Sequence, residues 1–288
     1  MSNLSCRGLA AVAASALLLA GCEQAEQEQP PVASEPATRI VSLAPHITEL
    51  VFAAGAGEQL VGVVEYSDFP AAAADLPRVG DAFRVDFEAI SLLQPDLVLS
   101  WESGNPIEIV ERLRELGYRV VETEPQGLES VAAQLQLIGD LAGTTDFADQ
   151  AAATLRKRIA ELGRNSEAAE PLSVFWQISA DPYFTVTHRH IINEVIELCG
   201  GRNIFADLSG VAPTVTFEAV LAERPDVIIA SVAPVDVTWK QGWQRWAQLP
   251  AVQQKHLYGV EPDLISRAGP RIVDGAAQVC AALEAARG

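Results

Sequence analysis

One segment with a distinctive pattern of hydrophobic and polar positions occurs twice along the chain. Residues 85–99 read VDFEAISLLQPDLVL, and residues 215–229 read VTFEAVLAERPDVII. Aligned without a gap, the two segments share Val, Phe, Glu, Ala, Pro and Asp, and each ends in three aliphatic residues. Because more than a hundred residues separate the copies, the repeat indicates a domain duplication, since solenoid repeats have far shorter periods.

Each copy predicts a short helix followed by a buried strand. Asp86 and Thr216 suit the N-cap of a helix, and Glu88 and Glu218 fall in its first turn. A Pro-Asp pair then ends the helix, and an apolar run follows that is too short for an amphipathic helix. Such a run is typical of a strand buried on both faces of a parallel sheet. The sequence therefore predicts an α/β fold with two similar lobes.

The remaining segments extend each lobe with further strands and helices. We expect an N-terminal lobe over residues 38–145 and a C-terminal lobe over residues 167–288. The segment 146–166 between them is long, Ala-rich and helical in pattern. This helix is either a stiff strut that joins the lobes or one more outer helix of the first lobe, and the pattern favours neither.

The N-terminus has the pattern of an export signal. Residues 1–22 contain one cation, Arg7, an apolar run, and the ending Leu-Ala-Gly-Cys, which resembles the bacterial lipoprotein signal. We expect Cys22 to become lipidated and to tether the protein to an extracytoplasmic membrane face. The alternative is an ordinary signal peptide with an incidental cysteine. Residues 23–37 are rich in Gln, Glu and Pro, which predicts a disordered linker.

Charge and cysteine content restrict the possible partners and the compartment. Acidic residues outnumber basic ones by 38 to 20, which argues against nucleic acid as a partner. With Cys6 in the signal and Cys22 lipidated, Cys199 and Cys280 remain for an oxidising compartment. We predict a disulfide between them; the alternative is two separate buried thiols.

The sequence contains no catalytic motif, neither G-x-S-x-G nor a Walker loop, so we do not expect an enzyme. His188 and His190 resemble half of a metal site without evident further ligands, so no metal is expected.

Aromatic residues at predicted strand ends indicate a binding face. Tyr66, Trp101 and Phe184 each fall at or after the carboxyl end of a strand, where open α/β sheets bind ligands. Singly, each is more typical of packing. Together they favour a cleft between the lobes that holds a large, partly apolar ligand. The first turn after a strand, which includes Pro45 and His46, should face the same ligand.

Several motifs resemble a known family. They are SLAPHITEL (42–50), EYSDFP (65–70), PDLVLSW followed by SGNP (95–106), IELCGGRNIF (196–205) and PRI (270–272). Together they resemble the cobalamin-binding proteins of bacterial ABC uptake transporters, in the helical-backbone class of substrate-binding proteins that also carries haem and siderophores. The resemblance extends from Arg39 to the C-terminus.

The resemblance implies two Rossmann-like lobes joined by a single long helix, with a corrin in the cleft. Tyr66 and Trp101 then contact the ligand, joined by Phe184, Asp263 and Arg267. The cysteine pair matches the family's disulfide.

The resemblance also implies how the protein meets its transporter. Glu88 and Glu218 match docking carboxylates that meet arginines on the two permease subunits. Cobalamin is then a transported ligand and not a cofactor, and the binding protein is expected to be a monomer. Haem or a ferric siderophore is the alternative ligand.

Some positions depart from the family's pattern. Ligand-facing aromatics of other members are replaced at Ala82, Ile178, Ala212 and Leu264, although Phe83 takes the place of the first. His46 stands where those members have a small residue. We expect it to face the cleft, in a hydrogen-bonding role more readily than beside the cobalt.

Overall fold

The computed structural model describes residues 35–164, 166 and 170–288. The predicted signal segment, the lipid site at Cys22 and residues 23–34 of the predicted linker lie outside the described residues. Residues 36–288 form one compact unit, to which the description below refers.

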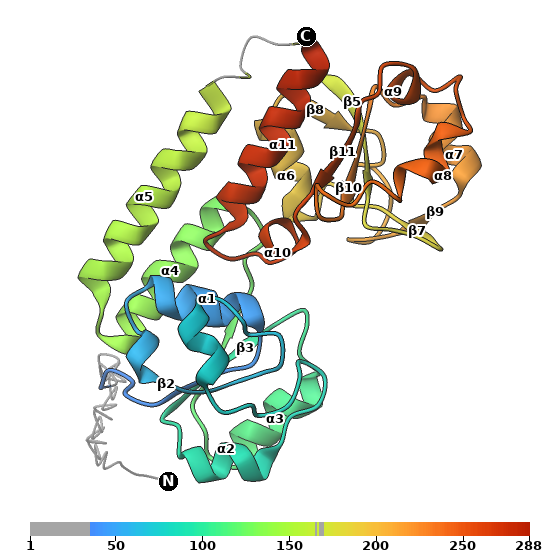
Figure 1. The fold of residues 1–288 in the computed structure, drawn as a ribbon. Helices are drawn as coiled ribbons and strands as arrows, with labels where there is room; N and C mark the ends of the chain where they lie inside the picture. Colours follow the sequence, from blue (N-terminus) through green and yellow to red (C-terminus); the bar gives the residue numbers. More distant parts are fainter. Residues whose placement is uncertain (1–34, 165, 167–169) are drawn as a thin grey trace, which may run out of the picture. The chain divides into compact units, whose positions relative to one another are not determined.

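Two four-stranded parallel sheets form the framework, and both have the same topology (Figure 1). The strand orders are β2-β1-β3-β4 and β11-β10-β5-β8, so in each sheet the lobe's first strand lies between its second and third. The first sheet contains β1 (Ile40–Ser42), β2 (Leu60–Val63), β3 (Leu97–Trp101) and β4 (Val120–Thr123). The second contains β5 (Leu172–Gln177), β8 (Gly201–Asn203), β10 (Val227–Ser231) and β11 (Leu257–Val260). The predicted α/β fold with two parallel-sheet lobes is confirmed.

The repeated segment forms the same local structure in each lobe. Helix α2 (Phe87–Leu93) begins at Asp86, whose carboxylate accepts the N–H groups of Glu88 and Ala89. Helix α7 (Phe217–Glu223) begins at Thr216, whose hydroxyl accepts the N–H of Ala219. Both N-caps were predicted from the sequence.

The ends of the repeat also match. Each helix ends at a residue in the left-handed conformation, Gln94 (φ 46°) or Arg224 (φ 49°). The aspartate that follows then anchors the neighbouring strand. Asp96 accepts the N–H of Thr38 at 2.8 Å, and Asp226 accepts the N–H of Ser173 at 2.9 Å. The Pro-Asp pair is therefore a tie between adjacent strands as well as a helix stop.

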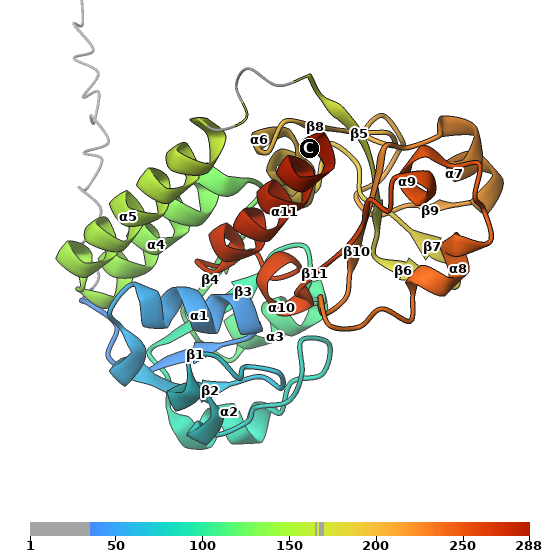
Figure 2. The same ribbon diagram turned by 45° about the horizontal axis from the view of Figure 1, so that its top comes forward.

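The remaining helices cover the sheets and join the lobes. They are α1 (Pro45–Ala53), α3 (Ile107–Glu115), α4 (Leu128–Ala142), α5 (Thr145–Arg164), α6 (Ile191–Leu198), α8 (Lys240–Gln244), α9 (Pro250–Gln253), α10 (Pro262–Ile265) and α11 (Ile272–Arg287), with short 3₁₀ turns at Gly57–Gln59 and Ala71–Asp75. Helices α4 and α5 run side by side (Figures 1 and 2). Helix α5 contacts α1 of the first lobe and α11 of the second. None of the described helices combines the length and apolar character needed to cross a membrane.

One hydrophobic core extends through both lobes. It includes Ile40 and Leu99 from the first sheet, Trp176 and Ile229 from the second, and buried residues of the helices between them. Each sheet packs a separate cluster on its other face, around Val41 in the first lobe and around Phe175 in the second. Because the lobes share a core, their relative movement would expose apolar surface.

The second lobe also contains a small three-stranded antiparallel sheet and the short helix α8. In the small sheet, β7 (Tyr183–Phe184) pairs antiparallel with β6 (Ser179–Ala180) and β9 (Thr214–Val215). Helix α8 is only five residues long, and its Trp243 is buried in the hydrophobic cluster around Phe175.

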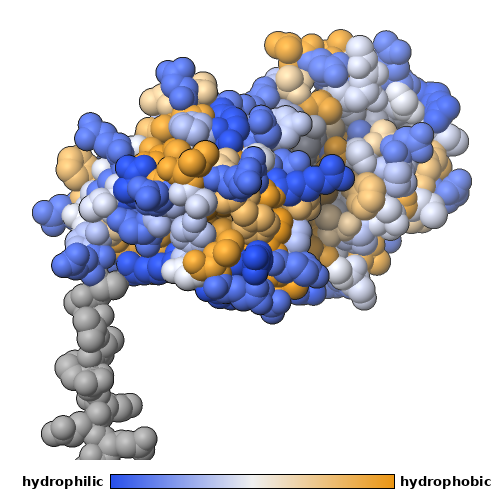
Figure 3. All heavy atoms as spheres, turned by 90° about the horizontal axis from the view of Figure 1, so that it is seen from below, coloured by the Kyte–Doolittle hydropathy of each residue, from blue (hydrophilic) through white to orange (hydrophobic). Residues whose placement is uncertain are grey.

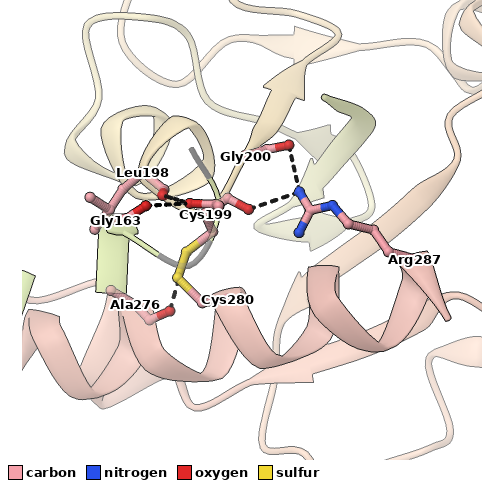
Figure 4. The surroundings of a disulfide bond; sticks show 8 residues. Gly163, Leu198, Cys199, Gly200, Ala276, Cys280 and Arg287 are labelled. Carbon is pink, nitrogen blue, oxygen red and sulfur yellow. Dashed lines mark hydrogen bonds between the residues drawn. A yellow bond between two sulfur atoms is a disulfide. The ribbon is translucent and has the colours of Figure 1, made fainter. Parts of the chain in front are cut away.

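A disulfide links α6 to α11, and Figure 4 shows its surroundings. Cys199 follows the last residue of α6 and pairs with Cys280 on α11, with their Cα atoms 4.6 Å apart. Gly200 (φ 73°) then turns the chain out of the helix, and Arg287 donates to the carbonyl groups of Cys199 and Gly200. The predicted pairing is confirmed, and the alternative of two separate thiols is wrong.

Candidate ligand-binding site

A cavity of about 730 Å³ is lined by residues of both lobes. The first lobe contributes the segments that follow β1, β3 and β4, which is the edge where parallel sheets bind ligands. The second lobe contributes the segment before α6, Val211 and the segment after α10. The lining residues are Pro45, His46, Trp101, Glu102, Ser103, Glu124, Pro125, Gln126, His188, Arg189, His190, Ile191, Val211, Ser266, Arg267 and Ala268.

His46 lies in the wall of this cavity as the second residue of α1. Its side chain is buried, and its ring meets Trp101 edge-on with the ring centroids 5.1 Å apart. Burial, and then the positive charge of Arg267, lowers the pKa of His46 to about 4, so the imidazole is neutral at neutral pH. Its Nε2 atom is buried and has no hydrogen-bond partner among the described residues.

A charge network borders the cavity at Arg267. This arginine pairs with the carboxylates of Asp68 (2.6 Å), Asp263 (3.1 Å) and Glu49 (3.3 Å). Arg271 binds Glu49 through two hydrogen bonds, of 2.8 and 2.6 Å. Because Glu49 lies on α1 and both arginines lie between α10 and α11, the network joins the two lobes beside the cavity.

The ion pairs of this network favour the charged form of Asp68. The hydrogen bond from Arg267 lowers the pKa of the Asp68 carboxyl. The Glu49 side chain is 2% exposed, and its ion pairs with Arg267 and Arg271 compensate for this burial.

The two other histidines of the cavity have local structural roles. His190 is the N-cap of α6, where its Nδ1 accepts the N–H of Ile192, and burial lowers its pKa to about 4. His188 Nδ1 lies 2.7 Å from the carbonyl oxygen of Ala206. Among the described residues, no group of three or more His, Cys, Asp or Glu side chains is arranged to hold a metal ion.

The structure brings four of the eight residues expected at the ligand together in one cavity wall. Pro45, His46, Trp101 and Arg267 line the cavity. Asp263 lies directly behind it as an ion-pair partner of Arg267.

Three of the expected aromatic residues are not among those that line the cavity. Tyr66 and Phe83 are exposed, by 76% and 68%, and Phe184 is half-buried in β7. Figure 3 shows exposed hydrophobic residues among hydrophilic ones on one face of the molecule.

Sequence reasoning missed several polar residues of the site. Glu102 and Glu124 follow β3 and β4 directly, so the strand-end rule that indicated Trp101 would also have found them. Glu49 and Arg271 had no such signal, because 222 positions separate them in the sequence.

The expected docking residues have equivalent surroundings. Glu88 and Glu218 are exposed in the first turns of α2 and α7, two positions after matching N-caps. This equivalence follows from the repeat.

Comparison with known proteins places the chain among binding proteins. The profile of the periplasmic binding protein family matches residues 40–264. A vitamin B12-binding protein of Vibrio cholerae is 36% identical over 253 residues, which cover 88% of this chain and 91% of that protein. One from Pectobacterium carotovorum is 34% identical over 250 residues, covering 86% and 88% of the two chains.

Solved structures of periplasmic binding proteins have a similar fold. The crystal structure of the periplasmic vitamin B12-binding protein of Vibrio cholerae aligns with a TM-score of 0.80 and 37% identity, covering 88% of this chain and 98% of that one. An apo periplasmic haem-binding protein from Roseiflexus sp. RS-1 aligns with a TM-score of 0.75 and 26% identity, covering 88% and 100% of the two chains.

Proposed function

The chain belongs to the periplasmic binding protein family, and we propose that it captures cobalamin or a related corrinoid and delivers it to an ABC uptake permease. The observation that carries this proposal is the similarity to vitamin B12-binding proteins, at 36–37% identity over 88% of the chain. The relatives are binding proteins, so the corrinoid is a cargo that leaves unchanged and is not a cofactor.

The ligand site that we propose is the cavity with the aromatic side chains beside it. Pro45, His46, Trp101 and Arg267 would form its wall. Tyr66 is two residues from Asp68, which pairs with Arg267. That pairing supports a place for Tyr66 at the rim of the cavity.

Phe83 is linked to the same wall through Asn105. The Asn105 amide nitrogen donates to the carbonyl of Ala82 at 2.8 Å, and its oxygen accepts the N–H of Trp101 at 2.7 Å. We propose Phe83 as a rim aromatic for this reason. Phe184 and Asp263 complete the proposed contacts on the second lobe.

Capture should require little movement of the lobes. The shared core and the contacts of Glu49 with Arg267 and Arg271 hold the lobes together beside the cavity. A binding site that is formed in advance avoids part of the ordering cost of association.

Release is assigned to the transporter. Exposed carboxylates at Glu88 and Glu218 lie in equivalent places of two similar lobes. A permease dimer with two-fold symmetry offers two equivalent surfaces. Each of the two carboxylates could then contact the same surface on one of the two subunits.

The protein acts in the periplasm, as its family does. We further propose that it is a monomer tethered through a lipid on Cys22, with residues 23–37 as a spacer. Mass spectrometry of the membrane-extracted protein tests this, because a lipidated N-terminal cysteine adds a defined mass that a Cys22→Ser variant lacks.

Isothermal titration of the mature protein with cyanocobalamin, cobinamide and haemin tests the ligand. We expect both corrinoids to bind with one site per chain and haemin to bind more weakly. A Trp101→Ala variant should weaken corrinoid binding. Tight binding of haemin without binding of either corrinoid would favour the haem alternative, for which the Roseiflexus structure is the precedent.

A further inference from the structure

One of the three histidines in the cavity has no hydrogen bond among the described residues. His188 and His190 each use a ring nitrogen to bind the backbone, at Ala206 and Ile192. His46 Nε2 is buried and has no partner. Most buried polar atoms in proteins are hydrogen-bonded, so an unpartnered ring nitrogen on a residue that lines a cavity marks that residue as a candidate to bind a ligand group.

The state of this imidazole suits donation of an electron pair. The His46 side chain is 6% exposed, and its pKa is lowered to about 4 by burial and by the charge of Arg267. At neutral pH the ring is therefore neutral and one nitrogen keeps a free lone pair. Neutral imidazole is the form in which histidine binds metals.

The surroundings exclude a conventional protein metal site at His46. No group of three or more metal-binding side chains is present among the described residues. A single imidazole is sufficient only where the metal brings its other ligands with it, as haem iron does with a proximal histidine. A corrinoid has this property, because its macrocycle supplies four nitrogen ligands to cobalt.

We propose that His46 is an axial nitrogen ligand to the cobalt of the bound corrinoid. This inference rests on the proposed function. The imidazole nitrogen replaces the water at one axial position of a corrinoid that lacks its own base, and no electron is transferred. Because Nε2 is covered in this structure, the ring turns about its side-chain torsions to reach the cobalt.

Electron paramagnetic resonance of bound cob(II)inamide tests the bond directly. Cobinamide is reduced chemically before it is mixed with the mature protein without oxygen. One coordinated ¹⁴N splits each cobalt line into three. Protein grown with ¹⁵N-labelled histidine should therefore give two lines in place of three. This pair of spectra uses the unaltered chain, so it does not depend on the folding of a variant.

Substitutions of single histidines identify the residue whose nitrogen splits the cobalt lines. His46→Gln should remove the splitting, whereas His188→Gln, which alters the same cavity, should retain it. His46→Gln should also weaken cobinamide binding at least about tenfold, with a smaller effect on cyanocobalamin, whose axial positions are both filled.

The outcomes of these experiments distinguish the proposed role of His46 from the proposed function of corrinoid binding. Binding of cob(II)inamide without nitrogen splitting, or splitting that persists in His46→Gln, overturns the role of His46 and leaves the proposed function standing. Failure of every corrinoid to bind overturns both.

Discussion

The two lobes have the same framework but different binding chemistry. Both sheets share one strand order, and both copies of the repeat share an N-cap, a left-handed stop and an aspartate that ties two strands. The cavity wall differs, because the first lobe supplies Trp101 and His46 and the second supplies Arg189 and Arg267. Duplication has therefore preserved the elements that fold each lobe, while the segments after the strands have diverged and line the proposed ligand site.

Substitution of the two proposed docking residues, Glu88 and Glu218, should have the largest effect. Glu88→Ala and Glu218→Ala together should abolish transport in reconstituted vesicles and leave the corrinoid affinity intact. Truncating one partner of a charge pair that is buried and hydrogen-bonded in an interface costs about 2–5 kcal/mol. Each single variant should lose an intermediate amount if the lobes contribute equally.

Glu108→Ala is the matched control, since Glu108 is also exposed in the first turn of a helix. Unchanged transport by the double variant would show that these carboxylates do not dock.

Glu49 and Glu194 test the contacts between lobes. Each lies on the first helix of its lobe. Glu49 is buried against Arg267 and Arg271, whereas Glu194 is exposed and accepts the N–H of Leu128. Glu49→Ala should lower the free energy of unfolding by about 3–5 kcal/mol, because it leaves two arginines without their buried partner.

The Glu194→Ala variant should lose only about 1 kcal/mol, the value of one hydrogen bond. Urea denaturation measures both. Equal losses of unfolding free energy in the two variants would contradict the expectation that Glu49 makes the stronger contact between the lobes.

His46 and His190 predict how acid affects stability. Both have a pKa of about 4 in the folded protein, below the ordinary value of 6.5. The unfolded chain therefore binds more protons between these values, and the stability due to each neutral ring is lost as pH falls from about 6.5 to 4. The loss is at most about 3 kcal/mol per histidine.

Urea denaturation between pH 7 and 4 measures this contribution as the difference between the parent and each variant. His46→Gln and His190→Asn each remove one titrating ring, and Asn keeps an N-cap acceptor on α6. A pH profile that neither substitution alters would rule out both shifts.

The N-caps give the smallest expected effect. Asp86→Ala and Thr216→Ala should each lower the free energy of unfolding by about 1 kcal/mol, because each removes an acceptor for the first turn of its helix. Similar losses of unfolding free energy in the two variants would support equivalent roles of the two N-caps. A loss in only one variant would show that the two lobes are not equivalent in this respect.

Much of the fold and part of the site could be predicted from the chain. Strand ends indicated Pro45, His46 and Trp101, and all three line the cavity. The strand-end rule works because parallel strands bring their carboxyl ends to one edge. Phe184 was less predictable, since it lies in a two-residue strand, β7, that pairs with the equally short β6 and with β9, 30 positions away. Short strands of this kind have no hydrophobic period of their own.

The sequence by itself determined the duplicated lobes, their caps and strands, and the cysteine pair, because each depends on nearby residues or on simple counting. Only the tertiary structure decided which side chains meet across the lobes. It placed Glu49 against Arg271 and the His46 ring against Trp101, with the buried Nε2 atom of His46 unpartnered in the part of the chain that the structure describes. Such contacts arise from the packing of distant segments around a common core, and no local pattern records them.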